Sequence, residues 1–100
     1  MAVIKQTRLD RIELTPSNII QLRFLLEDVD NGRVVSSAYH RTSLEPGILL
    51  VDQIATVNTH LFVMGWPTIP LRDQNQIALM VTREHTPVVI ATFNAARVHL

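Results

Sequence analysis

The spacing of hydrophobic positions changes about halfway along the chain. In the first part, apolar and polar residues alternate in short runs interrupted by turn signals, which is typical of half-buried β-strands. After Glu45-Pro46-Gly47, apolar residues recur at helical spacing. The pattern predicts one α+β domain over residues 1–100. A three-stranded antiparallel meander would occupy residues 1–45, and two or three helices within residues 48–98 would pack on one face of the sheet.

The strongest turn signal in the first part is Asp30-Asn31-Gly32-Arg33. Asn-Gly readily adopts the two positive φ angles of a type I′ turn, whose twist matches that of paired strands. A two-residue turn also sets the register of the strands that it joins. The expected cross-strand pairs are Leu26 with Ser37, Phe24 with Tyr39 and Leu22 with Arg41.

This register separates the side chains of the hairpin by polarity. One face, which we assign to the core, gathers Ile20, Leu22, Phe24, Leu26, Val35 and Tyr39. His40 and Thr42 would project from the opposite, polar face, with Arg23 opposite His40. These three residues are candidates for a docking surface. The alternative is that they only solvate an exposed sheet face.

A second turn signal, Thr15-Pro16-Ser17-Asn18, indicates an additional strand before the hairpin. Proline suits the second position of such a turn, and asparagine tolerates the left-handed backbone conformation. We expect the turn to join a strand at about Arg8–Leu14 to one at Ile19–Val29. The expected cross-strand pairs are Leu9 with Phe24 and Asp10 with Arg23.

Apolar residues in the second half of the chain predict helices. The first stripe advances by four, three, four and three residues through Leu50, Ile54, Val57, Leu61 and Met64. Gly65 and Pro67 are typical of the residues just beyond a helix end. A second helix is expected at Leu71 to about Glu84, and Thr86-Pro87 should open a third. The inward residues would be Ile77, Met80 and Val81 on the second helix, and Val89, Ile90 and Phe93 on the third.

Trp66 is the fourth candidate interaction residue. It lies in an extended connector, Trp66-Pro67-Thr68-Ile69-Pro70, between the first two expected helices. Connectors lie at protein surfaces, where an exposed tryptophan can anchor a partner. A tryptophan also buries a large apolar area when it packs in a core. Both interpretations of Trp66 stay open at this stage.

Composition limits the kinds of partner. Nine basic and nine acidic residues leave no excess of positive charge, so nucleic acid is not an expected partner. No apolar run is long enough to span a membrane, and the first eight residues lack a secretory signal. Hydrophobic residues make up 47% of the chain at zero net charge, which favours self-association or a permanent protein partner.

No residue pattern predicts a catalytic, cofactor or metal site. The chain has no cysteine, nucleophile elbow or phosphate-binding glycine loop. A calcium loop starting at Asp28 would place Arg33 where glycine is needed and Tyr39 where glutamate is needed. The histidines lack the spacing that directs two ligands to one ion, and they are His40, His60, His85 and His99. We therefore expect a protein that is not an enzyme and needs no cofactor.

Four segments taken in order resemble small proteins of tailed phages and prophages, often encoded beside tail or tail-fibre genes. They are Tyr39-His40-Arg41-Thr42, Val57-Asn58-Thr59-His60-Leu61, Met64-Gly65-Trp66-Pro67 and His85-Thr86-Pro87. The resemblance spans about Arg8 to Phe93 and carries over no functional residues. It implies a virion or virion-assembly protein of the tail, baseplate or fibre region, assembled in the host cytoplasm. Greater apolarity at Ile48–Val51 and Val88–Ile90 departs from that pattern and suits a chain packed into an assembly.

Several functional hypotheses follow. The leading hypothesis is a virion structural protein that binds other phage structural proteins, as a homo-oligomer or in a hetero-complex. It would dock through its exposed sheet face, a free strand edge or its apolar helices. The alternatives are a tail-fibre assembly chaperone or adaptor, and a capsid-cementing protein. A small nucleic-acid-binding regulator is a hypothesis of another class, and the balanced charge argues against it.

Overall fold

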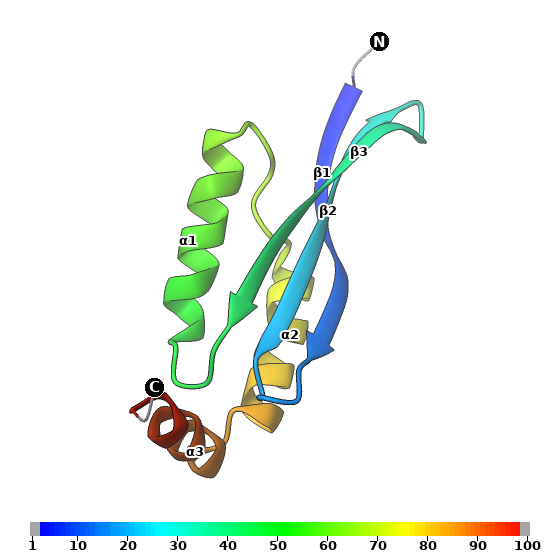
Figure 1. Ribbon diagram of the computed structural model, residues 1–100. Coiled ribbons are helices and arrows are strands. Elements are labelled where there is room, and N and C mark those ends of the chain that lie inside the picture. The colour runs from blue at the N-terminus through cyan, green and yellow to red at the C-terminus, as the bar shows by residue number, and fades with distance from the viewer. Residues whose placement is uncertain (1–2, 99–100) are drawn as a thin grey trace.

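The computed structural model describes residues 3–98 and has three strands followed by three helices (Figure 1). The elements are β1 (Val3–Leu14), β2 (Ile20–Asp30), β3 (Arg33–Leu44), α1 (Leu50–Val63), α2 (Leu71–Glu84) and α3 (Pro87–Val98). The strands form one antiparallel sheet in the order β1-β2-β3. The predicted α+β class and the predicted meander are thus confirmed.

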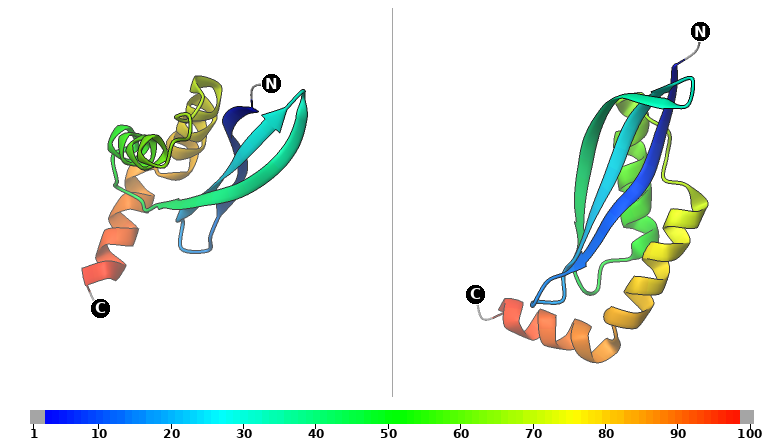
Figure 2. Two further views of the ribbon diagram at one scale, coloured as in Figure 1. Left: turned by 90° about the horizontal axis from the view of Figure 1, so that it is seen from above. Right: turned by 90° about the vertical axis from the view of Figure 1, so that its right-hand side faces the viewer.

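The molecule is elongated, because the sheet extends past the helices that cover it. Helices α1 and α2 lie on one side of the sheet, the covered face, and the opposite side is the open face (Figures 1 and 2). The β2–β3 turn projects at one end and α3 lies at the other. The principal extents are 55 × 23 × 20 Å and the radius of gyration is 15.7 Å. A compact chain of this length has a radius of gyration of about 13 Å.

The core lies between the covered face and the two helices. As predicted, alternate residues of β2 point into it, and the residues between them turn to the open face. The buried core cluster consists of Ile20, Leu22, Phe24, Leu26, Leu44, Val57, Leu61, Ile69 and Ile77. Its members come from β2, the end of β3, both helices and the connector between them, so apolar burial joins the two halves of the chain.

The turn between β2 and β3 has the predicted conformation, but the register beyond it differs. Asn31 and Gly32 have φ angles of 50° and 76°, as a type I′ turn requires. The pairing then shifts at a β-bulge that leaves Val35 without a partner. The predicted register is therefore wrong by one residue. The observed pairs are Leu26 with Ala38, Phe24 with His40 and Leu22 with Thr42.

Burial explains why the bulge is favoured. It sets Leu44 opposite Ile20, where both side chains are fully buried. Without it, Ser43 would face Ile20 and Arg41 would lie under the helices. Enclosing a guanidinium without a partner is far more costly than forming a bulge. Two predicted core residues instead end up more than half exposed, and these are Val35 and Tyr39.

Strand β1 begins earlier than predicted, at Val3 instead of about Arg8. Leu9 pairs with Phe24 as expected, and a second bulge follows at Asp10. Consequently Arg11, and not Asp10, is the strand partner of Arg23. The predicted contact between Asp10 and Arg23 survives as an ion pair next to the bulge.

Helix α1 ends as the sequence predicts. The N–H of Gly65 donates to the carbonyl of Phe62 at 3.0 Å, and the N–H of Trp66 donates to that of Leu61 at 2.8 Å. Together with a φ angle of 83° at Gly65, these bonds form a Schellman motif. The predicted inward stripe is buried or half-buried at Leu50, Ile54, Val57 and Leu61, whereas Met64 at the helix end is exposed.

Helix α2 matches the predicted bounds and inward residues, whereas α3 matches the predicted start but not the predicted burial. Helix α2 spans the predicted residues, with Ile77 fully buried and Met80 and Val81 packed against the core. Helix α3 opens with the hydroxyl of Thr86 accepting a hydrogen bond from the N–H of Val89, as expected of a cap. Its predicted inward residues are only half-buried and lie outside the core cluster, because α3 extends beyond the end of the sheet (Figure 1). They are Val89, Ile90 and Phe93.

Candidate functional site

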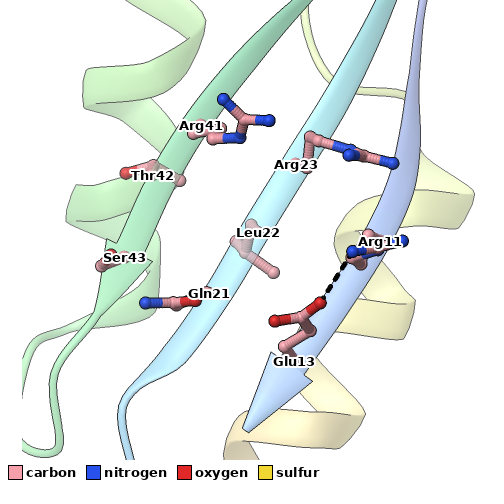
Figure 3. Close-up of a pocket in the computed structure, with 8 residues that line it drawn as sticks. All are labelled: Arg11, Glu13, Gln21, Leu22, Arg23, Arg41, Thr42 and Ser43. Atoms are coloured by element: carbon pink, nitrogen blue, oxygen red, sulfur yellow. Dashed lines mark hydrogen bonds and ion pairs between the residues drawn. The ribbon is translucent and has the colours of Figure 1, made fainter. Parts of the chain in front are cut away.

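Three arginines lie side by side across the open face and form the candidate site. The strand register pairs Arg11 on β1 with Arg23 on β2, and Arg23 with Arg41 on β3 (Figure 3). Like charges directly opposite one another destabilise a sheet. This arginine row therefore needs compensating negative charge, either from the chain itself or from a ligand.

The chain compensates two of the three positive charges. Arg23 Nε donates to Asp10 Oδ2 at 2.7 Å, and Arg11 Nη1 donates to Glu13 Oε1 at 3.0 Å. No carboxylate within the described part of the chain pairs with Arg41. Its guanidinium lies 5.8 Å from the ring centre of Tyr39, beside that of Arg23 at 4.5 Å. Arg41 is thus the uncompensated end of the arginine row.

A shallow hollow of about 230 Å³ lies at the arginine row. It is lined by residues of all three strands, among which Leu22 and Thr42 direct their side chains to the covered face, and these residues are Arg11, Glu13, Gln21, Leu22, Arg23, Arg41, Thr42 and Ser43 (Figure 3). Guanidinium, amide and hydroxyl groups all donate hydrogen bonds, and a guanidinium can hold a carboxylate or phosphate through two of them. The chemistry of the hollow therefore suits an anionic oxygen group.

A nearby acid on the open face is not available to the arginine row. Glu27 is buried, and its Oε1 accepts hydrogen bonds of 2.9 Å from both Arg8 Nε and Gln6 Nε2. The bond from Arg8, followed by that from Gln6, lowers the pKa of Glu27. The carboxylate of Glu27 is therefore occupied by side chains of β1, and it does not pair with Arg41 on β3.

The predicted docking residues do not come together. Arg23 lies on the open face as expected, but the bulge at Val35 moves His40 and Thr42 to the covered face. There Thr42 Oγ1 accepts a hydrogen bond of 2.7 Å from Gln53 on α1. The predicted opposition of Arg23 and His40 is therefore wrong. Arg11 and Arg41, which the prediction missed, share the open face with Arg23 instead.

Trp66 takes an intermediate position between the two interpretations. It is half-buried and packs against the core cluster. Lys5 Nζ lies over its ring, 4.2 Å from the centre, which is a cation–π contact. Lys5 also pairs with Asp28 Oδ1 at 2.8 Å. Trp66 thus lies at the border of the core, with the core cluster on one side and the Lys5–Asp28 ion pair on the other.

His40 contacts a second histidine under the sheet. Its ring centre is 6.3 Å from that of His60 on α1, with the rings 71° apart. Burial of His40 lowers its pKa, and the charge of His60 lowers it further. The folded protein therefore binds a proton at His40 less readily than the unfolded chain does.

Acidification should consequently destabilise the fold through His40. The stabilising contribution is complete above the unfolded pKa of about 6.5 and is lost as the pH falls through the lower folded pKa. We expect the free energy of unfolding to decrease between about pH 7 and 5 in the original protein, and less steeply in His40→Gln. Urea unfolding at several pH values measures this slope. His60→Gln should flatten it only in part, and an unchanged slope in His40→Gln would contradict the assignment.

Other kinds of site find no support in the described residues. No group of three or more potential metal ligands occurs among them, and the contact between His40 and His60 involves only two. His85 instead contacts the backbone oxygen of Asn18 at 2.8 Å, while His99 lies outside the described residues. None of the helices that the structure describes is long and apolar enough to cross a membrane. Comparisons with protein-family models, curated proteins and solved structures give no match to this chain.

Proposed function

We propose that the chain is a non-enzymatic structural or interaction protein of a tailed-phage virion, in the tail, baseplate or fibre region. The four resembling segments support the phage setting. The observation that carries the interaction role is the amount of surface left exposed, which is 6619 Å². A compact monomer of 11.3 kDa would expose about 5,700 Å².

Much of this surface is apolar and lies on the helices. Val51 and Phe62 on α1, and Leu71 and Leu79 on α2, are each at least 70% exposed. A shallow groove between the helices includes Val51 and is lined by Leu50, Val51, Ile54, Gln74, Asn75 and Ala78. Burying apolar area contributes about 25 cal/mol per Å², so a protein partner on this helical groove would gain stability from it.

Self-association through the helical groove is the first expected result. The molar mass of the purified protein in solution should exceed 11.3 kDa, and Val51→Glu, at an exposed residue of the groove, should bring it back towards that value. A charge at Val51 would have to be buried in the interface, which is strongly unfavourable. Val34→Glu, at an exposed valine near the β2–β3 turn, is the matched control and should not change the mass. If the original protein is monomeric, self-association is contradicted, and the proposed interaction would have to be with a different protein.

The phage setting is tested on purified particles. Mass spectrometry of washed virions should detect the chain at a fixed copy number relative to the tail proteins, and tail fractions should retain it. Detection in capsid fractions alone would assign a cementing role instead. If finished particles lacked the chain and it copurified with a fibre protein from infected cells, it would be an assembly chaperone or adaptor. Absence of the chain from both the washed virions and the purified fibre-protein complex would contradict the proposed function.

A further inference from the structure

The two edges of the sheet differ in how far the chain protects them. On β1, the N–H of Leu9 donates to Asp73 Oδ2 on α2 at 2.9 Å, and Thr7 Oγ1 donates to the carbonyl of Pro67 at 2.7 Å. Both Thr7 and Asp73 are buried. Helix α2 and the connector therefore cover the β1 edge around Thr7 and Leu9, where an added strand would have to displace them.

The edge of β3 is protected only near its end. Gln53 Nε2 lies 3.4 Å from the carbonyl of Ser43. Between Arg33 and Arg41, no group of the described chain other than β2 hydrogen-bonds the β3 backbone. Figure 2 shows β3 along one border of the sheet. An edge of this length without a cover is a template for strand addition.

The outward backbone groups of β3 can be identified by alternation. The N–H of Leu9 points away from β2, so its strand partner Phe24 directs its own backbone groups towards β3. Phe24 and His40 are then a hydrogen-bonded pair, and the residues between such pairs point outwards. These are Ser37, Tyr39, Arg41 and Ser43, which agrees with the contact from Gln53 to Ser43.

This alternation places the charge of Arg41 beside the free edge. The side chains of Ser37, Tyr39 and Arg41 lie on the open face, and their backbone groups point towards any added strand. An acidic residue opposite Arg41 on that strand would meet the one guanidinium of the arginine row that lacks a carboxylate among the described residues. Strand addition and charge pairing would thus occur at the same position.

Charge also decides between a partner segment and a second copy of β3. Between Arg33 and Leu44 the sequence has two arginines, one histidine and no acidic residue. A second β3 strand would therefore bring further positive charge to the arginine row and no carboxylate. An acidic segment complements both the backbone and the charge.

We propose that the free edge of β3 binds an extended acidic segment of a partner protein, with a carboxylate of that segment paired to Arg41. This inference rests on the interaction role proposed above and specifies the chemistry of one partner. It concerns the sheet edge and not the helical groove, so the two surfaces can be tested separately.

A labelled peptide tests the proposal. The probe is an acetylated decapeptide of alternating threonine and glutamate, which places all its carboxylates on one face of a strand. Fluorescence anisotropy at low ionic strength should show binding that added salt weakens. Glutamine in place of every glutamate, or Arg41→Gln in the protein, should weaken binding about tenfold or more, because each removes a charge-assisted hydrogen bond. Arg83→Gln on α2 is the control and should bind like the original protein.

The edge itself is tested by a proline substitution. The N–H of Ser37 points outwards, so Ser37→Pro should remove a donor for the added strand while leaving the pairing with β2 intact. Circular dichroism confirms that each variant is folded. We expect Ser37→Pro to weaken peptide binding as strongly as Arg41→Gln. Slower amide exchange at Ser37, Tyr39 and Arg41 on binding would locate the peptide at the edge.

Three outcomes would overturn the inference. One is equal binding of the glutamine peptide, or undiminished binding by Arg41→Gln. Another is tighter, Arg41-dependent binding of an oligothymidylate, which would make the ligand a nucleic acid. The third is a dimer of the original protein that Ser37→Pro dissociates, which would make the occupant a second copy. None of these alters the mass spectrometry of washed virions, so failure of this inference is distinguishable from failure of the proposed function.

Discussion

Replacing Phe24 with alanine should lower the free energy of unfolding by about 3–5 kcal/mol. Phe24 is fully buried on the central strand, between Leu9 and His40 of the neighbouring strands. Truncation removes most of its apolar contacts and leaves a cavity in the core cluster. Domains of this size have a total stability of about 5–15 kcal/mol, so the variant should be close to unfolding at room temperature.

Urea titration monitored by circular dichroism measures this loss as a lower transition midpoint. Val35→Ala is the matched control, because Val35 is 60% exposed at the bulge. Its effect should stay within about 0.5 kcal/mol. Similar losses in the two variants would show that the covered face has been assigned wrongly, and with it the register on which the arginine row depends.

Replacing Asp73 with alanine should cost about 1–3 kcal/mol, because it removes the hydrogen-bond partner of a protected backbone group. Asp73 is buried, and its Oδ2 accepts the N–H of Leu9 at 2.9 Å. Without that oxygen, the N–H of Leu9 is left unpaired beside α2. The edge of β1 should then resemble the free edge of β3.

Amide exchange provides a residue-specific measurement of this effect. The N–H of Leu9 should exchange faster in Asp73→Ala, and Asp73→Asn should largely preserve its protection because the amide oxygen can still accept the bond. Phe24 lies next to Leu9 but does not bond Asp73, so its amide exchange should change less. Unchanged exchange at Leu9 in the alanine variant would contradict the role assigned to Asp73.

Much of the fold can be predicted from local sequence. Asn31-Gly32 specifies a type I′ turn because both residues tolerate positive φ angles. The helical stripe through Leu50 and Leu61 identifies α1, and Gly65 marks its end. Thr86 and Pro87 identify the start of α3. Each of these signals acts within a few residues, so the sequence suffices to recognise it.

The candidate site depends on features that local sequence does not reveal. Two bulges, at Asp10 and Val35, bring Arg11, Arg23 and Arg41 into one row. Each bulge adds one residue to one strand and exchanges the faces of all residues beyond it. An uninterrupted register, which the sequence suggests, places Arg41 under the helices and His40 on the open face. The charge of Arg41 argues against that placement, but it does not say where the bulge lies.

The sequence by itself determined the order and type of the elements, the core face of β2 and the ends of the helices. These follow from hydrophobic period and from residues that restrict the backbone, and both act over short distances. Tertiary structure decided the register of β3, the position of α3 beyond the sheet and the half-buried position of Trp66. Each of these reflects competition for one core between residues far apart in the chain, in which burying Leu44 opposite Ile20 outweighed an uninterrupted strand pairing.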